Sequence, residues 1–122
     1  MIIKLKEKEK QIVEPKAVAQ ILSNVLSAEQ KLDQDKEHFW TIGLNSRNYI
    51  QYIDLVSLGT LNASLVHPRE VFRLAVHKGI NQLIIAHNHP SGELERSNED
   101  LKITKRLVQA GKILGIEVLD HI

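Results

Sequence analysis

The amino-acid sequence predicts a single α/β domain in which helices flank a mixed central β-sheet. Three observations lead to this prediction. The 122 residues suffice for one modest hydrophobic core but not for two. Segments with the period of amphipathic helices alternate along the chain with short apolar and β-branched runs that are typical of strands. No internal repeat or linker divides the chain into separate units.

The first half of the chain is predicted to contain one helix followed by a β-hairpin. Pro15 suits the first turn of a helix, because its missing N–H has no partner there. Residues 37–44 and 49–58 are rich in aromatic and β-branched residues and are predicted to be strands. The residues between them, Asn-Ser-Arg-Asn at 45–48, have turn chemistry. The apolar stripe of the helix is made by Val18, Ile21, Leu22, Val25 and Leu26.

The second half is predicted to contain two helices that alternate with two strands. A helix starts at Pro68 and ends at Gly79, and residues 81–86 form a buried strand. A longer helix is predicted for residues 97–114 and a last strand for residues 116–122. The apolar face of the longer helix is expected to consist of Leu101, Thr104, Leu107, Val108, Gly111 and Leu114.

Composition and charge limit the classes of function. A nominal net charge of +1 gives no reason to expect nucleic acid or an acidic membrane as a partner. The chain has no cysteine, which excludes disulfides, thiolate zinc sites and cysteine nucleophiles. Charges interrupt the apolar start of the chain at once, and no stretch approaches the ~18 apolar residues that span a bilayer. A cytoplasmic protein without a membrane-spanning segment is therefore expected.

The residues most typical of a reactive site lie in the stretch 86–100, which reads AHNHPSGELERSNED. His87 and His89 are two apart and should point to the same side of an extended backbone, while Asn88 faces away. Asp100 should lie in the first turn of the following helix, where the helix dipole favours a carboxylate. Two imidazoles and one carboxylate suit zinc, with a fourth position open for water. Ser97 can cap the helix, and its hydroxyl can also reach the metal site.

A catalytic zinc site also needs a base that takes the proton from water. Glu37 is favoured because a charge directly before a hydrophobic strand is unusual unless it has a function, although it could also be the solvated end of that strand. Glu70 is the main alternative to it. Two histidines and a carboxylate can also bind Fe(II), whereas the usual zinc deaminases need cysteine ligands. The complete set of candidates for this base is Glu37, Glu70, Glu93, Glu95 and Glu99.

Four of these residues match a known motif without a gap. His87, His89, Ser97 and Asp100 have the spacing of the JAMM metalloprotease motif: His-x-His, seven residues, Ser, two residues, Asp. The chain also resembles the bacterial RadC-like branch of that superfamily from about residue 37 onward. The similar segments are GTLNASLVHPREVFRLAV (59–76), AHNHPSG (86–92), SNEDLKITKRL (97–107) and GIEVLDHI (115–122).

The resemblance implies a JAMM-type, cytidine-deaminase-like α/β fold and zinc bound by His87, His89 and Asp100. It also implies that Ser97 helps to stabilise an oxyanion, and that Glu37, which aligns with the upstream glutamate of the family, is the general base. The activity it implies is hydrolysis of a peptide or isopeptide bond in a protein or peptide substrate. The name RadC suggests an alternative function, a DNA-associated or DNA-repair accessory role. Little in the sequence supports it beyond Lys102, Lys105, Arg106 and Lys112.

The chain departs from the family pattern in three ways. Relatives usually carry proline before the motif serine, where this chain has Arg96, which would loosen the loop. They also carry an N-terminal helix-hairpin-helix module, whereas residues 1–14 are expected to form a tail or an edge strand. The RadC-like domain is expected to span residues 15–122 and to be truncated at its C-terminal end, because one or two further strands would follow Ile122.

The remaining polar residues are assigned mainly structural roles. His67 is expected to cap the helix that starts at Pro68. Arg69 and Glu70 could either pair within that helix or line the cleft. The other histidines with predicted positions are His38 and His77, expected to be exposed, and His121, expected to have a structural role together with Asp120.

Overall fold

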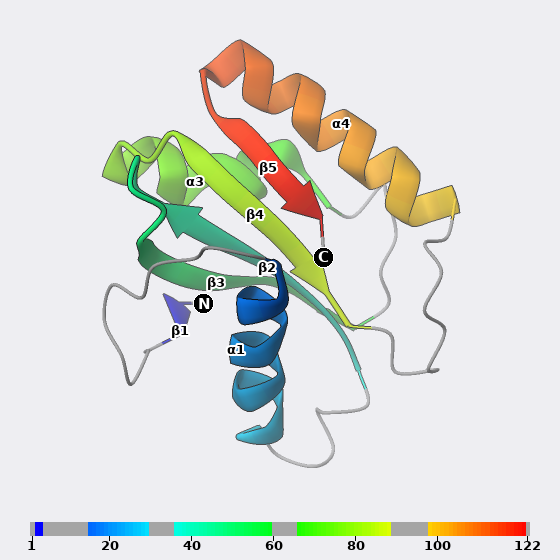
Figure 1. Cartoon of the computed structure of the whole chain (residues 1–122). Coiled ribbons are helices and arrows are strands. Elements are labelled where there is room, and N and C mark those ends of the chain that lie inside the picture. Colours follow the sequence, from blue (N-terminus) through cyan, green and yellow to red (C-terminus); the bar gives the residue numbers. More distant parts are fainter. Residues whose placement is uncertain (1, 4–14, 30–35, 60–65, 89–97, 122) are drawn as a thin grey trace.

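The computed structural model describes residues 2–3, 15–29, 36–59, 66–88 and 98–121 of the chain. Within these residues, a five-stranded sheet has the order β1-β3-β2-β4-β5 (Figure 1). The pairing of β4 with β5 is parallel and the other pairings are antiparallel, so the sheet is mixed, as predicted. The strands are β1 (Ile2–Ile3), β2 (Glu37–Leu44), β3 (Ile50–Gly59), β4 (Gln82–His87) and β5 (Glu117–His121). The helices are α1 (Pro15–Ser27), α3 (Pro68–Lys78) and α4 (Asn98–Leu114).

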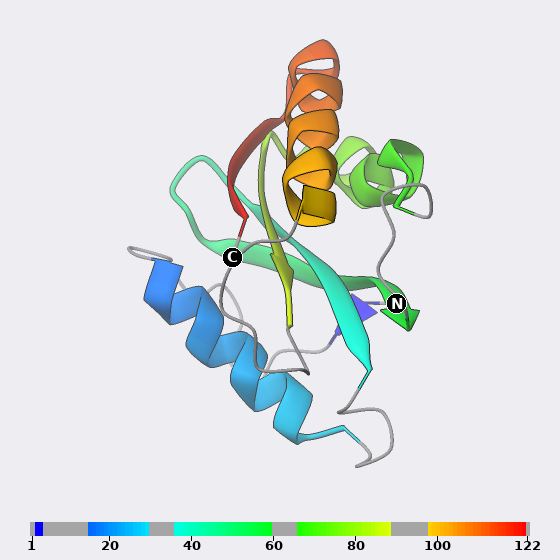
Figure 2. The same cartoon turned by 90° about the vertical axis from the view of Figure 1, so that its right-hand side faces the viewer.

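Helices cover both faces of the sheet (Figures 1 and 2). On one face, Val18 of α1 belongs to a buried cluster with Trp40 of β2. On the other face, Phe72 of α3 and Leu107 of α4 belong to a second cluster with Phe39 of β2. Neighbouring positions of β2 thus face opposite clusters, as the pleat of a strand requires. Among the residues that the structure describes, no helix has both the length and the apolar character needed to cross a bilayer.

The ends of α3 and α4 follow the sequence prediction closely. Gly79 and Gly115 have positive φ angles of 69° and 73°, which glycine adopts without strain. The N–H of the residue after each glycine donates to the carbonyl five residues earlier at 2.8 Å, as in a Schellman motif. His67 occupies the N-cap position of α3, but its side chain makes no capping hydrogen bond. The prediction that His67 caps the helix is therefore wrong, since capping favours shorter side chains whose oxygen reaches the N2 or N3 amide.

The face that α4 turns toward the sheet is rotated from the predicted one. Leu101 and Leu114, both predicted to lie in the apolar face, are 52% and 50% exposed. Asp100 and Ile103, which were not predicted to lie in that face, are buried together with Leu107, which was. These three residues have i, i+3, i+7 spacing and form one stripe along the helix. The prediction from hydrophobic periodicity was rotated from the observed face because it did not count the carboxylate residue Asp100 among the inward positions.

Tyr52 is a buried polar side chain in the cluster that α3 and α4 cover. Its ring lies over Gly43, where an added Cβ would be 2.2 Å from a ring carbon. Within the described part of the chain, the Tyr52 hydroxyl has no hydrogen-bond partner. Burial, and to a lesser degree the charge of Asp54, raise the pKa of Tyr52 well above its ordinary value of 10.0. The phenol is therefore held in its neutral form.

Tyr52→Phe is expected to leave the free energy of unfolding at pH 7 unchanged or raised, because it removes a buried hydroxyl without a partner. In the wild type, the unfolded chain loses the tyrosine proton first as the pH rises past about 10. The contribution of neutral Tyr52 to stability is thus present below that pH and is lost above it. Urea unfolding between about pH 9 and pH 11 should therefore show a shallower decline for Tyr52→Phe. An identical decline in both proteins would contradict the raised pKa.

Candidate metal centre

His87 and Asp100 meet where β4 ends and α4 begins. His87 is the last residue of β4, and Asp100 is the third residue of α4. The Nε2 atom of His87 lies 3.2 Å from the Oδ1 atom of Asp100. Their side chains are 5% and 4% exposed, so the contact is almost fully shielded from solvent. The structure thus brings together two of the three predicted metal ligands.

Local structure explains why these two side chains converge. Leu83 and Ile85 of β4 belong to the cluster covered by α3 and α4. His87 follows at the same two-residue spacing, so its ring points to that face of the sheet. Asp100 lies on the inward stripe of α4 and in the first turn of the helix, where the positive end of the dipole favours a carboxylate. The rotation of α4 therefore determines that the carboxylate faces the imidazole.

The separation of the two donor atoms fits a shared metal ion. Two ligands on tetrahedral zinc, each about 2.0–2.1 Å from the ion, lie roughly 3.3 Å apart. The same separation also fits a hydrogen bond from a ring N–H of His87 to the carboxylate. His89 and Ser97 lie outside the described residues. Within the described residues, no group of three or more metal-binding side chains occurs, so the pair supplies part of the predicted site.

Glu37, the predicted base, is the first residue of β2 and is partly buried. In the antiparallel pairing of β2 with β4, Phe39 lies opposite His87. Directly opposed residues point to the same side of a sheet, as do residues two apart on one strand. The side chains of Glu37, Phe39 and His87 are therefore on the same face, the one that α3 and α4 cover. This face also carries the contact between His87 and Asp100.

Glu70, the main alternative base, lies on α3 with half of its side chain exposed. Its carboxylate is 4.0 Å from the guanidinium of Arg73, which is one helical turn away. Glu70 thus pairs within its own helix, with Arg73 rather than with Arg69. The other candidate bases lie outside the described residues, either entirely or in their side chains: Glu93, Glu95 and Glu99.

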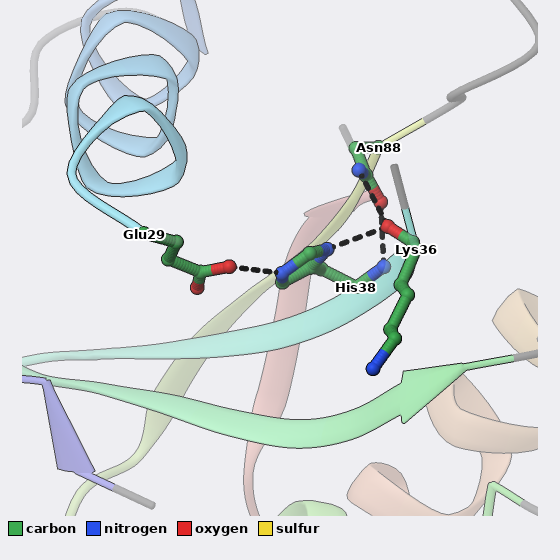
Figure 3. Close-up of polar contacts among 4 residues, drawn as sticks. All are labelled: Glu29, Lys36, His38 and Asn88. Carbon is green, nitrogen blue, oxygen red and sulfur yellow. Dashed lines mark hydrogen bonds and ion pairs between the residues drawn. The ribbon is translucent and has the colours of Figure 1, made fainter. Parts of the chain in front are cut away.

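His38 is buried on the α1 face of the sheet, opposite the face that carries the contact between His87 and Asp100, so the prediction that it is exposed is wrong. Its Nε2 atom lies 2.6 Å from a carboxylate oxygen of Glu29, and its Nδ1 atom lies 2.7 Å from the carbonyl oxygen of Lys36 (Figure 3). The ring stacks on Trp40 with a centroid distance of 5.0 Å. A sequence signal for this burial exists, because His38 and Trp40 are two apart on a strand and share one face. His77, the other histidine predicted to be exposed, is exposed at the end of α3.

Asn88 is a second residue whose role the sequence did not indicate. Its Oδ1 atom accepts a hydrogen bond from the backbone N–H of His38 at 2.5 Å. Its Nδ2 atom donates to the carbonyl oxygen of Lys36 at 3.0 Å (Figure 3). Strand alternation predicts that Asn88 points away from His87 but names no partner for it. The partner becomes visible only when β2 and β4 are aligned in register.

Comparison with known proteins identifies the family. A family model described as RadC-like JAB domain matches residues 12–122. A UPF0758 protein of Desulforamulus reducens is 48% identical over 97 residues, which are 80% of this chain and 43% of that protein. A UPF0758 protein of Caldanaerobacter subterraneus subsp. tengcongensis is 54% identical over 87 residues, 71% of this chain and 37% of that protein. A UPF0758 protein of Finegoldia magna is 47% identical over 109 residues, which are 89% of this chain and 47% of that protein.

The chain therefore spans less than half the length of these relatives. The family match covers every helix and all strands of the described structure except β1. It confirms the resemblance to the RadC-like branch and the JAB-type α/β fold that this resemblance implies. The chain belongs to the family of RadC-like JAB domains.

Proposed function

We propose that this chain is a zinc-dependent hydrolase that cleaves a peptide or isopeptide bond in a protein or peptide substrate. The observation that carries the proposal is the buried contact of 3.2 Å between His87 and Asp100. The superfamily to which the RadC-like JAB domains belong contains metalloproteases. The relatives' names, UPF0758, state no activity, so the proposal depends on the residues of this chain.

A buried imidazole and carboxylate could also form a purely structural pair. Two features favour a metal site. The pair lies where a strand ends and a helix begins, which is where functional side chains are often presented, and not in the middle of the core. The sequence also supplies His89 and Ser97 at the spacing of the JAMM motif. A structural pair would need neither of these two residues.

In the proposed site, His87, His89 and Asp100 would hold the ion. A bound zinc ion supplies Lewis acidity, which lowers the pKa of water and polarises a carbonyl group. Glu37 accepts the proton from the attacking water and then donates it to the leaving amine. The hydroxyl of Ser97 donates a hydrogen bond to the oxygen of the scissile carbonyl as negative charge develops there.

The direct test is a search for zinc-dependent cleavage. The chain, purified without a polyhistidine tag, is incubated with a peptide library and with isopeptide-linked peptides, and the products are identified by mass spectrometry. We expect cleavage that stops when a chelator removes zinc, returns when zinc is restored, and is absent from Asp100→Ala. Cleavage that survives in Asp100→Ala, or a zinc-loaded chain that cleaves neither substrate class, would contradict the proposal.

The alternative function is a DNA-associated role. Its structural support is a set of exposed basic side chains on α4, of which Arg106 also donates to the carbonyl oxygen of Val66 at 3.5 Å. Binding through such a face should weaken steeply with salt, because phosphate contacts release counterions. Salt-sensitive retention on duplex or single-stranded DNA would favour this role, and no retention at low salt would count against it. The exposed residues are Lys102, Lys105, Arg106 and Lys112.

A further inference from the structure

One side-chain amide connects the two strands from which the proposed base and a proposed metal ligand come. Asn88 follows His87 directly, where β4 ends. Its side chain bonds to Lys36 and His38, the residues on either side of Glu37 (Figure 3). The backbone N–H of Asn88 also donates to the carbonyl oxygen of His38, at 3.4 Å. The start of β2 is therefore held by three hydrogen bonds from one residue.

These bonds act on both peptide groups that adjoin Glu37. The carbonyl of Lys36 belongs to the peptide group before Glu37, and the N–H of His38 belongs to the peptide group after it. The two backbone torsions of a residue are set by the planes of these two groups. One carboxamide that bonds to both groups therefore limits φ and ψ of Glu37, and with them the direction of its Cα–Cβ bond.

A second contact fixes the peptide group before Glu37 from the α1 side of the sheet. The Nδ1 atom of His38 lies 2.7 Å from the Lys36 carbonyl oxygen, which also accepts from Asn88. Because a carbonyl oxygen only accepts, Nδ1 carries a proton in this contact. The other ring nitrogen lies 2.6 Å from a carboxylate oxygen of Glu29, so both ring nitrogens have a polar partner. The ring itself is fully buried and cannot turn away easily.

The register of the strands links this arrangement to the metal centre. Phe39 lies opposite His87, so the next opposed pair along the strands is His38 with Asn88. In a regular antiparallel rung the N–H of His38 would meet a main-chain oxygen, but here the Oδ1 atom of Asn88 accepts it. The side chain of Asn88 thus takes the place of the main-chain oxygen in the last hydrogen-bonded pair of β2 and β4. The position of Glu37 relative to His87 is fixed by the residue next to His87 itself.

We propose that Asn88 is a positioning residue that holds Glu37 in place relative to the metal centre. The catalytic part of this inference rests on the proposed function, whereas the effect on the order of Glu37 does not. A general base must lie within hydrogen-bond reach of the proton that it removes. A misplacement of about 1 Å can reduce turnover about a hundredfold. Asn88 would therefore affect turnover without touching substrate.

The test compares Asn88→Ala with Asn81→Ala, a matched control in which an exposed asparagine before β4 is removed. In the zinc-free chain, hydrogen exchange of the His38 amide should become at least about tenfold faster in Asn88→Ala, because the amide loses its acceptor. NMR relaxation of the Glu37 methylene groups should show a lower order parameter than in the wild type. Asn81→Ala should change neither quantity.

Turnover is the second measurement. On a substrate from the library, we expect Asn88→Ala to lower kcat about a hundredfold. KM and the affinity for zinc should stay within about threefold, because Asn88 is not itself a proposed ligand. A merely structural role would not separate kcat from KM in this way.

Asn88→Asp keeps the acceptor for the His38 N–H but removes the donor to Lys36. It should preserve the protected His38 amide, increase the mobility of Glu37 and lower kcat, and it carries the test if Asn88→Ala does not fold. An unchanged Glu37 order parameter together with wild-type kcat in a folded variant would overturn the inference while leaving the proposed function intact. A mobile Glu37 in a chain that cleaves nothing would uphold the positioning of Glu37 and contradict the hydrolase.

Discussion

Asp100→Ala is expected to lower the affinity of the chain for zinc by at least about a hundredfold. Residues that only support a metal ligand typically contribute ten- to about a hundredfold in affinity, and Asp100 is proposed as a ligand itself. Its carboxylate is buried against the Nε2 atom of His87, so its removal takes away one of the proposed protein ligands from the site. Competition with a chromophoric chelator on the metal-free protein measures the affinity directly.

Two further variants test whether the loss of zinc affinity is specific to the carboxylate of Asp100. Glu117→Ala removes an exposed carboxylate from β5 and should keep the wild-type affinity. Asp100→Asn keeps the size and polarity of the side chain but removes its charge, and should also lose zinc, which prefers an ionised carboxylate. A folded Asp100→Ala chain that binds zinc as tightly as the wild type would show that the contact with His87 is structural.

Glu37→Gln is expected to keep zinc and to lose turnover by roughly 10²–10⁴-fold. Glutamine has nearly the same size as glutamate and keeps a hydrogen-bonding oxygen, but it cannot accept the proton from water. Since Glu37 is proposed to move a proton and not to bind the ion, zinc stoichiometry should not change. The measurement is kcat on a substrate from the peptide or isopeptide library, together with metal analysis of the same preparation.

Glu70→Gln is the matched control for this prediction. Glu70 is half exposed on α3 and faces Arg73, so its replacement should change kcat by no more than about twofold. Loss of turnover in Glu70→Gln with normal turnover in Glu37→Gln would assign the base to Glu70. Normal turnover in both variants would contradict the proposed proton transfer altogether.

The sequence by itself determined the secondary structure and the fold class. The predicted strand at residues 37–44 has the observed bounds of β2, and the predicted start of one helix at Pro68 is the observed start of α3. The helix predicted to end at Gly79 does so, and the helix predicted for residues 97–114 ends at Leu114, just before Gly115. These features depend on local signals, such as alternation, proline in a first helical turn and glycine with positive φ, which neighbouring residues carry on their own. The spacing of the motif likewise named His87 and Asp100 as residues that should meet.

Only the tertiary structure decided which faces and backbone groups meet. The rotation of α4 that turns Asp100 inward depends on packing against the sheet, and hydrophobic periodicity overlooked it because a carboxylate interrupts the apolar stripe. The burial of His38 beside Glu29 depends on where α1 ends relative to β2. The bonds from Asn88 to both sides of Glu37 depend on the register of β2 and β4, which are far apart in the sequence. Such contacts follow from the pairing of distant segments, and no local pattern of residue types encodes that pairing.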